Sequence, residues 1–333
     1  VGAGSLLLLG ATGCSGGGSG SGGGETSSDP ARTIEHKYGS TEVRGTPGRV
    51  VTVGYTDQDP VLALGVAPVA VREWFGEYPS ATWPWAQDEL GDTEPEVLPA
   101  GELNFEQISG LDPDLIIGVS SGMTVEEYAT LSEIAPVVVQ PDEYVDFGVP
   151  WQEQTRLVGR ALGRQQRAED LVSEVEAQFA EAREDHPEFE GASGVVVGLT
   201  SEDESYTPSP YGPQDSRSRF LESLGFEMPE EISELAGDSF FTDLSRERLG
   251  LIDTDLLVWV AVQADDFEAV KTDPLYQQLD AAQEGRDVFL EELPAGALSF
   301  STVLSLPFAL DELVPRFAAA VDGDPNTNAE AAS

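Results

Sequence analysis

The side chains best suited to contact a ligand lie close together in one short aromatic segment. Residues 72–87, "REWFGEYPSATWPWAQ", contain three of the five tryptophans of the chain within twelve residues. Two prolines in this segment favour a loop over a buried helix or strand. Such a loop can be pinned to the core by its rings, or it can offer an aromatic wall to a bulky, partly apolar ligand. The residues expected to form that wall are Trp74, Trp83 and Trp85.

A second group of candidate ligand contacts lies in residues 205–220, "SYTPSPYGPQDSRSRF", which follow a predicted strand. This segment offers Tyr206, and it places Arg217 and Arg219 beside the start of a predicted helix. Basic residues are scarce in this chain, and two guanidinium groups at such a place can clamp an anionic group of a ligand. They can equally form ordinary salt bridges with the abundant acidic side chains.

The motifs of the common enzyme classes are missing from the sequence. It contains no G-x-S-x-G nucleophile turn, and neither of its two lysines lies in a phosphate-binding loop. The histidines, His36 and His186, are far apart at the edges of predicted elements, which argues against a zinc or manganese cluster. The sequence therefore predicts a binding protein rather than an enzyme, with no metal site and no resident cofactor.

The chain is strongly acidic, with 61 acidic and 17 basic residues and a formal net charge of −44. Such a surface repels nucleic acid, because nucleic-acid binding depends largely on lysine and arginine. It also disfavours adsorption to anionic lipid, so membrane association has to come from an anchor. The acidic excess is typical of a well-solvated surface, and it also fits a protein from a salt-rich habitat.

An anchor is indicated by the only cysteine, Cys14, which follows a run of four leucines and several small residues. This order is typical of the end of a secretory signal, and the adjoining glycine- and serine-rich tract gives a buried cysteine nothing to pack against. The pattern resembles the lipobox of bacterial lipoproteins, although Ala11 stands where that motif usually has leucine and no basic segment precedes the leucines. We expect residues 1–13 to be a signal remnant and residues 14–33 a lipid-anchored linker.

The rest of the chain alternates short apolar runs with helical segments, which predicts an α/β fold with mostly parallel sheets. Residues 151–186 have helical spacing and are expected to join two α/β lobes through one long helix. The N-terminal lobe is expected to cover residues 34–150 and the C-terminal lobe residues 187–322. Residues 323–333 form a polar tail.

The two predicted lobes share a sequence pattern. Residues 106–115, "EQISGLDPDL", and residues 247–256, "ERLGLIDTDL", agree at a glutamate, two aliphatic positions, two aspartates and a final leucine. Similar elements are predicted in the same order around both segments, including, in residues 219–229, a helix ended by Gly225 and then a strand. This repetition indicates two lobes of similar architecture.

Ligands of parallel α/β sheets bind beyond the carboxyl ends of the strands. Tyr55 follows the first predicted strand, and Ser120 and Ser121 follow the strand in "DLIIGV". We expect these side chains to face the same crevice as the tryptophan-rich segment. Phe300, in "GALSFST", is a further candidate from the second lobe.

Several segments, taken in order over roughly residues 34–320, resemble one known family. "GRVVTVGYTDQDPVLALGVAPVAV", "NFEQISGLDPDLIIG", "LVGRALGRQQRAEDLV" and "TVLSLPFALDELVP" resemble bacterial iron-siderophore ABC-transporter substrate-binding lipoproteins, notably actinobacterial ones. The resemblance implies two α/β lobes bridged by one long helix, a shallow cleft between them and little lobe movement on binding. It also implies a ferric siderophore as ligand, in which the siderophore itself holds the iron.

The resemblance further implies an ABC permease and its ATPase as partners. In this family a surface glutamate on each lobe docks into arginines of the membrane subunits. Glu106 and Glu247 match these glutamates by motif and by the internal symmetry. Two exposed acids favoured at helix starts by the helix dipole would give the same pattern.

Together these observations predict a monomeric, exported and lipid-anchored protein on the outer face of the cytoplasmic membrane, which delivers a ferric siderophore to an importer. The same architecture can carry haem or cobalamin, and Tyr55 or Tyr206 is available as a haem ligand. A tethered cell-wall enzyme and a structural or adhesive lipoprotein are the alternatives from other classes. The sequence does not indicate whether the siderophore is a hydroxamate, a catecholate or mixed.

Overall fold

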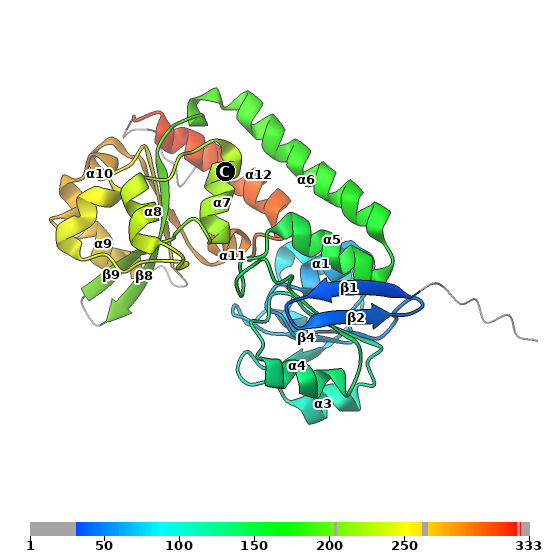
Figure 1. Ribbon diagram of the computed structural model, residues 1–333. Helices are drawn as coiled ribbons and strands as arrows, with labels where there is room; N and C mark the ends of the chain where they lie inside the picture. The colour runs from blue at the N-terminus through cyan, green and yellow to red at the C-terminus, as the bar shows by residue number, and fades with distance from the viewer. Residues whose placement is uncertain (1–30, 203–204, 262–265, 325–326, 328–333) are drawn as a thin grey trace, which may run out of the picture.

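Two α/β lobes lie beside each other in this protein, and the helix α6 (Gln165–Asp185) extends along both of them (Figure 1). The predicted fold class, two lobes with mainly parallel sheets, is confirmed. Cys14 lies outside the described residues. The structure is a computed structural model, and it describes residues 31–202, 205–261, 266–324 and 327.

The N-terminal lobe is built on a five-stranded parallel sheet in the order β5-β4-β3-β6-β7. Every residue of its central strands β3 and β6 is buried, as is usual where helices cover both faces of a parallel sheet. The strands are β3 (Val50–Thr52), β4 (Ala70–Arg72), β5 (Glu96–Leu98), β6 (Leu115–Gly118) and β7 (Val137–Val139). The helices are α1 (Gln58–Ala63), α2 (Gln87–Leu90), α3 (Phe105–Gly110) and α4 (Val125–Ser132).

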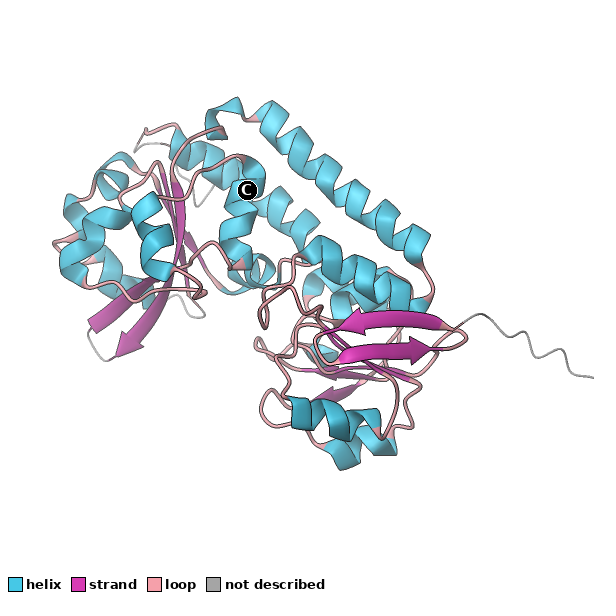
Figure 2. Ribbon diagram, viewed as in Figure 1, coloured by secondary structure: helices cyan, strands magenta, loops and turns pink. Residues whose placement is uncertain are grey.

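The C-terminal lobe is built on a four-stranded sheet in the order β11-β10-β8-β9, in which only β9 runs antiparallel to its neighbour (Figure 2). Its strands are β8 (Gly194–Glu202), β9 (Ser205–Pro210), β10 (Leu256–Val260) and β11 (Asp287–Leu290). Its helices are α7 (Ser216–Leu224), α8 (Glu230–Ala236), α9 (Asp266–Lys271), α10 (Asp280–Glu284), α11 (Glu292–Phe300) and α12 (Ser305–Val321).

Two helices connect the lobes, α5 (Trp151–Leu162) and the 21-residue α6. Gly163 ends α5 in the left-handed conformation, with a φ of 71°, as its place after the last apolar residue predicts. At 1.5 Å per residue, α6 is about 31 Å long, enough to extend along both lobes. It buries an apolar stripe with helical spacing, formed by Ala168, Leu171, Val172, Val175 and Phe179.

Three boundaries differ from the sequence prediction. Residues 205–210, expected to belong to a loop, form the strand β9. The strand expected after Gly225 is reduced to a single bridge between Ser193 and Glu227. At the other end, β1 (Arg32–His36) pairs with β2 (Gly39–Val43) in a hairpin, so the last two residues of the predicted linker belong to a strand.

Two prolines in β9 explain why the sequence did not predict this strand. The carbonyl oxygens of Pro208 and Pro210 point away from β8 and accept hydrogen bonds from the amides of Leu244 and Thr242. In an antiparallel pair the N–H and C=O of one residue point to the same side. The missing N–H groups of both prolines therefore lie on the outer side, where proline is tolerated in an edge strand.

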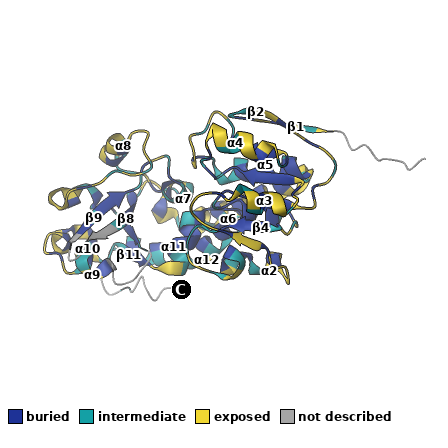
Figure 3. Ribbon diagram, turned by 90° about the horizontal axis from the view of Figure 1, so that it is seen from below, coloured by how far each residue is buried: buried dark blue, intermediate teal, exposed yellow. Residues whose placement is uncertain are grey.

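The lobes are joined by a common hydrophobic core. One buried cluster runs from the N-terminal sheet through α5 and α6 to α12 and the C-terminal sheet. Figure 3 shows buried segments in both sheets and in the helices between them. The lobes are therefore packed onto each other, and separating them would expose apolar surface to water.

A second contact wedges the aromatic segment of the N-terminal lobe against α11 of the C-terminal lobe. The ring of Trp83 is 2% exposed, and its nearest atom lies 2.3 Å from where a Cβ atom on Gly296 would stand. Phe300, at the end of α11, lies 5.5 Å from Trp83 and 5.3 Å from Trp85 between ring centroids. The close approach of the two lobes requires glycine at position 296.

Replacing Gly296 by alanine is expected to destabilise the protein by about 1–3 kcal/mol, although alanine is the better helix former. The new methyl group would collide with Trp83, whose ring is held by stacking on Trp85 at 4.8 Å. Urea unfolding measures the loss. Gly110→Ala is the matched control, because nothing lies within 4 Å of that Cβ position. Equal stability of the two variants would contradict a tight contact between Trp83 and Gly296.

Candidate functional site

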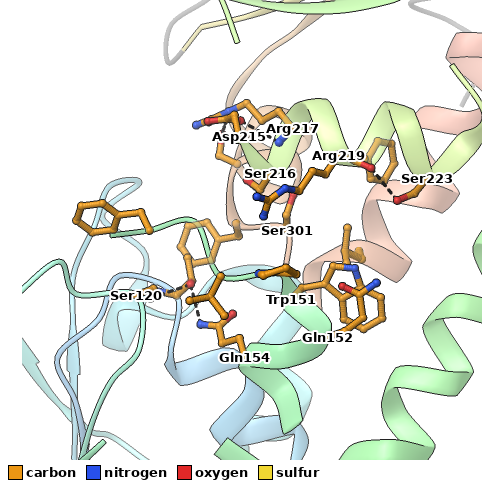
Figure 4. Close-up of a pocket in the computed structure, with 18 of the residues that line it drawn as sticks. Ser120, Trp151, Gln152, Gln154, Asp215, Ser216, Arg217, Arg219, Ser223 and Ser301 are labelled. Carbon is orange, nitrogen blue, oxygen red and sulfur yellow. Dashed lines mark hydrogen bonds and ion pairs between the residues drawn. The ribbon is translucent and has the colours of Figure 1, made fainter. Parts of the chain in front are cut away.

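A cleft of about 530 Å³ opens between the two lobes. Both lobes and the start of α5 contribute to its walls, as Figure 4 shows. The volume is within the range of small-molecule binding sites. The aromatic residues of its lining are Tyr55, Trp74, Phe147, Trp151, Phe179, Phe220, Phe240 and Phe300. Of the candidate site residues from the sequence, those that line the cleft are Tyr55, Trp74, Arg217, Arg219 and Phe300.

Tyr55 is held firmly in the wall of the N-terminal lobe. Its ring lies between Trp74 and Phe147, at centroid distances of 5.8 and 6.1 Å. The buried guanidinium of Arg72 lies 4.4 Å from the same ring and donates hydrogen bonds to backbone carbonyls of neighbouring loops. The Tyr55 hydroxyl donates to the carbonyl of Ala100 at 3.0 Å. These contacts present the ring to the cleft in one orientation.

A buried polar network supports the cleft on the same side. The fully buried carboxylate of Asp57 accepts hydrogen bonds from the amide and hydroxyl of Ser120, at 3.1 and 3.0 Å, and from Nε2 of Gln154 at 2.9 Å. Burial raises the pKa of Asp57, while these hydrogen bonds oppose the shift. Because Ser120 and Gln154 line the cleft, the network fixes two polar groups of the lining.

Arg217 enters the cleft from the C-terminal lobe with its charge already paired. Its Nη1 donates to both carboxylate oxygens of Asp215, at 3.1 and 3.0 Å, and its Nε donates to the hydroxyl of Ser299 at 3.2 Å. The guanidinium also lies 4.3 Å from the ring centroid of Tyr211. Asp215 further caps α7 by accepting from the Arg217 amide.

Arg219 lies two residues further along α7 and bridges the two lobes. Its Nη1 donates to the carbonyl of Gly148 in the N-terminal lobe at 2.9 Å, and Nη2 donates to Oε1 of Gln214 at 3.4 Å. Within the described part of the chain, no carboxylate lies within ion-pair distance of Arg219. Desolvation lowers the pKa of this guanidinium. Figure 4 shows the side chain extending from α7 toward Ser301.

The expectation that Trp83 and Trp85 line the cleft is wrong. Trp83 is packed onto α11 at Gly296, and Trp85 donates from its Nε1 to the buried carboxylate of Asp59 at 2.9 Å. Both rings are taken up by the contact between the lobes. The tryptophan-rich segment therefore has both of the roles considered for it. Trp74 faces the cleft, and Trp83 and Trp85 pin the loop to the rest of the protein.

Ser121 and Tyr206 are also absent from the cleft lining. The Ser121 hydroxyl turns back to the Gly118 carbonyl at 2.7 Å, and its neighbour Ser120 lines the cleft instead. Tyr206 is buried in the C-terminal lobe, where its hydroxyl donates to Asp273 at 2.9 Å. Burial and this carboxylate raise the pKa of Tyr206. Because Tyr206 belongs to β9 rather than to a cleft loop, it is not placed to ligate haem there.

Five aromatic residues of the cleft lining were not anticipated as ligand contacts, namely Phe147, Trp151, Phe179, Phe220 and Phe240. Phe147 and Phe240 lie in irregular loops, for which the sequence offers no periodic signal. Trp151 was recognised only as the first residue of a helix. Phe147 is 50% exposed and has a φ of 65°, and its ring occupies the space where a Cβ on Gly122 would stand. A left-handed conformation is unfavourable for phenylalanine, so this ring is held over Gly122 at a cost in backbone energy.

Glu106 and Glu247 lie on opposite lobes, far from each other in the sequence. Glu106 is exposed in the first turn of α3, and Glu247 is exposed in the first turn of a 3₁₀ helix (Arg246–Ile252). Neither residue lines the cleft. Their equivalent places agree with the internal symmetry, and their part in docking stays a prediction.

In the ranges that the structure describes, no group of three or more His, Cys, Asp or Glu side chains is placed to hold a metal ion. In the same ranges, no helix has the length and apolar character needed to cross a membrane.

The fold agrees with that of known proteins. A family model described as "Periplasmic binding protein" matches residues 50–292. The chain belongs to this family. The family consists of binding proteins. The prediction of a binding protein rather than an enzyme is therefore confirmed.

Individual relatives of this periplasmic binding protein support the same assignment. The probable siderophore-binding lipoprotein YfiY of Bacillus subtilis is 28% identical over 253 residues, which cover 73% of this chain and 72% of that protein. A periplasmic solute binding protein of Mycobacterium smegmatis is 33% identical, with a TM-score of 0.79 over 87% of this chain and 99% of that one. The PiaA protein of Streptococcus pneumoniae in complex with ferrichrome is 27% identical, with a TM-score of 0.75 over 88% of this chain and 99% of that one.

A buried carboxyl group ties the lobes of the periplasmic binding protein together beside the cleft. Asp59, in α1, accepts hydrogen bonds from Trp85 Nε1 and from the hydroxyl of Thr302 in the C-terminal lobe. Burial raises the pKa of Asp59 from 3.8 to about 6, although both hydrogen bonds act against the shift. Between these two values the folded protein binds more protons at this group than the unfolded chain does. The contribution of Asp59 to the free energy of unfolding therefore falls as the pH rises through this interval.

Asp59→Asn should remove this pH dependence. The amide can still accept the hydrogen bonds from Trp85 and Thr302, but it does not ionise in the buried junction. Compared with the wild type, the free energy of unfolding of the variant should gain about 2 kcal/mol between pH 4 and pH 7. Urea unfolding at several pH values measures the difference. The exposed Glu94→Gln is the control, and a difference between Asp59→Asn and wild type that stays constant with pH would contradict the assignment.

Proposed function

We propose that this protein captures a ferric siderophore in its interlobe cleft and delivers it to an ABC importer. The observation that carries the proposal is the aromatic lining of a 530 Å³ cleft between two joined lobes. Aromatic rings suit the organic shell of an iron chelate. A bare ion instead requires clustered nitrogen, oxygen or sulfur ligands.

The relatives support an iron chelate over other small molecules. YfiY is named as a probable siderophore-binding lipoprotein, and the PiaA structure contains ferrichrome. Both proteins match this chain across most of its length. The coarser function, a substrate-binding protein of the iron-chelate type, is the part on which these relatives agree.

The geometry suggests how each side of the cleft contributes to binding. Trp74, Phe147 and Trp151 offer faces and edges for the apolar parts of the chelate, and Phe300, in ring contact with Trp74, adds an apolar surface from the C-terminal lobe. The polar edge of the chelate would meet Arg219, whose guanidinium has spare donors. Since Tyr55 and Ser120 are already fixed by hydrogen bonds, little ordering of the lining is needed on binding.

Calorimetric titration with ferric hydroxamate, catecholate and mixed siderophores tests the proposal. At least one ferric form should bind saturably below micromolar concentration, and its iron-free form more weakly. Trp74→Ala should weaken binding about tenfold, through loss of one ring contact. Leu275→Ala removes an apolar side chain that is 44% exposed outside the cleft, and it should bind as the wild type does. Binding of haem or cobalamin alone would overturn the ligand and leave the fold unaffected.

The proposal includes attachment to the outer face of the cytoplasmic membrane through lipid on Cys14, which lies outside the described residues. Its support is the lipobox-like sequence and a relative named as a lipoprotein. The anchored protein would carry the chelate to the permease without diffusing away. An unmodified thiol at Cys14 in membrane-extracted protein would rule out this anchor.

Delivery would use Glu106 and Glu247, one on each lobe, as contacts for arginines of the two permease subunits. Reversing both charges, Glu106→Arg with Glu247→Arg, should abolish uptake of the iron chelate by cells while the purified variant binds it normally. The control pair is Glu126→Arg with Glu230→Arg, which changes an exposed first-turn glutamate on each lobe. Uptake that is equally affected in both pairs would contradict specific docking.

A further inference from the structure

The cleft has a charge balance unlike that of the rest of the protein. The chain carries a formal net charge of −44. The charged residues among the described lining are Asp215, Arg217, Arg219 and Glu222, and their formal charges cancel. A ligand that enters this cleft therefore leaves a strongly negative surface for a site that is nearly neutral.

Of the two arginines, Arg217 has little charge to offer a ligand. Its ion pair with Asp215 is held at 3.0 Å, and the two side chains are only 14% and 8% exposed. Drawing Arg217 toward a ligand would leave the carboxylate of Asp215 buried without its partner, which costs several kcal/mol. The pair behaves as one neutral, hydrogen-bonded unit of the wall.

Arg219 is different, because its hydrogen bonds go to a backbone carbonyl and to a neutral amide. Among the described lining residues it is the cation without a carboxylate partner. Glu222, one turn further along α7, is exposed and also lines the cleft, so it limits how much negative charge can gather near Arg219.

The buried charges next to the cleft do not add positive potential. Arg72 lies against the ring of Tyr55, but Asp57 lies under Ser120 and Asp59 lies under Trp85. One buried cation is thus matched by two buried carboxyl groups on the same side of the site. Arg219 remains the positive charge that a ligand can reach.

We infer that the cleft selects ferric chelates that carry at most one net negative charge, and that Arg219 is the residue that sets this limit. The inference rests on the proposed function. A neutral trishydroxamate complex places its apolar periphery on the rings and a carbonyl or hydroxamate oxygen on Arg219. A triscatecholate complex with three negative charges would keep two of them unmatched by a cationic side chain of the aromatic cleft lining, which is unfavourable.

The test compares the dissociation constants of two ferric complexes, a neutral trishydroxamate and a trianionic triscatecholate, measured by calorimetry on the full protein. In the wild type the trianion should bind at least about tenfold more weakly. Asp215→Asn keeps an oxygen for the α7 cap and frees the charge of Arg217, so it should reduce this ratio about tenfold. Arg219→Gln should increase the ratio.

The control is Glu181→Gln, which changes the net charge by the same amount as Asp215→Asn but lies exposed on α6, outside the cleft. It should leave the ratio within about twofold of the wild type, because exposed charges at that distance are screened. Tighter binding of the trianion by wild type, or equal shifts for Asp215→Asn and Glu181→Gln, would overturn the inference. Should Asp215→Asn not fold, the opposite shift in Arg219→Gln decides alone. Failure of both complexes, and of ferric mixed siderophores as well, to bind would instead reject the proposed function.

Discussion

The contact between Trp83 and Gly296 sets the distance between the two lobes, and the binding site depends on that distance. An indole ring of the N-terminal lobe fills the place of a side chain on a helix of the C-terminal lobe. The same aromatic group includes Phe300, which reaches Trp74 at 5.3 Å and so joins the wedge to the cleft lining. The contact between Trp83 and Gly296 thereby holds residues of the two lobes on either side of one ligand-sized cleft.

Several other contacts make this arrangement resistant to hinge motion. The common core continues through α6 and α12, Asp59 accepts a hydrogen bond from Thr302, and Arg219 donates across the cleft to Gly148. A site formed in this way is largely in place before the ligand arrives, so little of the binding free energy is spent on ordering protein groups. The small lobe movement that the family resemblance implies stays a prediction. In such a site the shape and charge of the cleft, more than closure, govern which chelate is accepted.

The overall fold could be predicted from the sequence because its signals are local: short buried runs for parallel strands, and glycine after the last apolar turn at Gly163. The site was predicted only in part, because it depends on contacts between distant segments. Nothing local distinguishes Trp74, which faces the cleft, from Trp83, which is taken up by Gly296 more than 200 residues later. Tyr206 was predicted to lie in a cleft loop because the prolines around it argue against a strand, whereas it belongs to the edge strand β9. Phe147 was not predicted as a ligand contact because irregular loops have no periodicity.

We propose that an iron chelate lies in the cleft between Trp74, Trp151 and Arg219. Diffraction from crystals grown with a ferric siderophore, with the iron located by its anomalous scattering, tests it most directly. We expect one iron peak inside the cleft, surrounded by chelator atoms, with Arg219 as the cation facing the chelate and no protein atom bound to the metal. An iron peak outside the cleft, or one ligated directly by side chains of the protein, would contradict it.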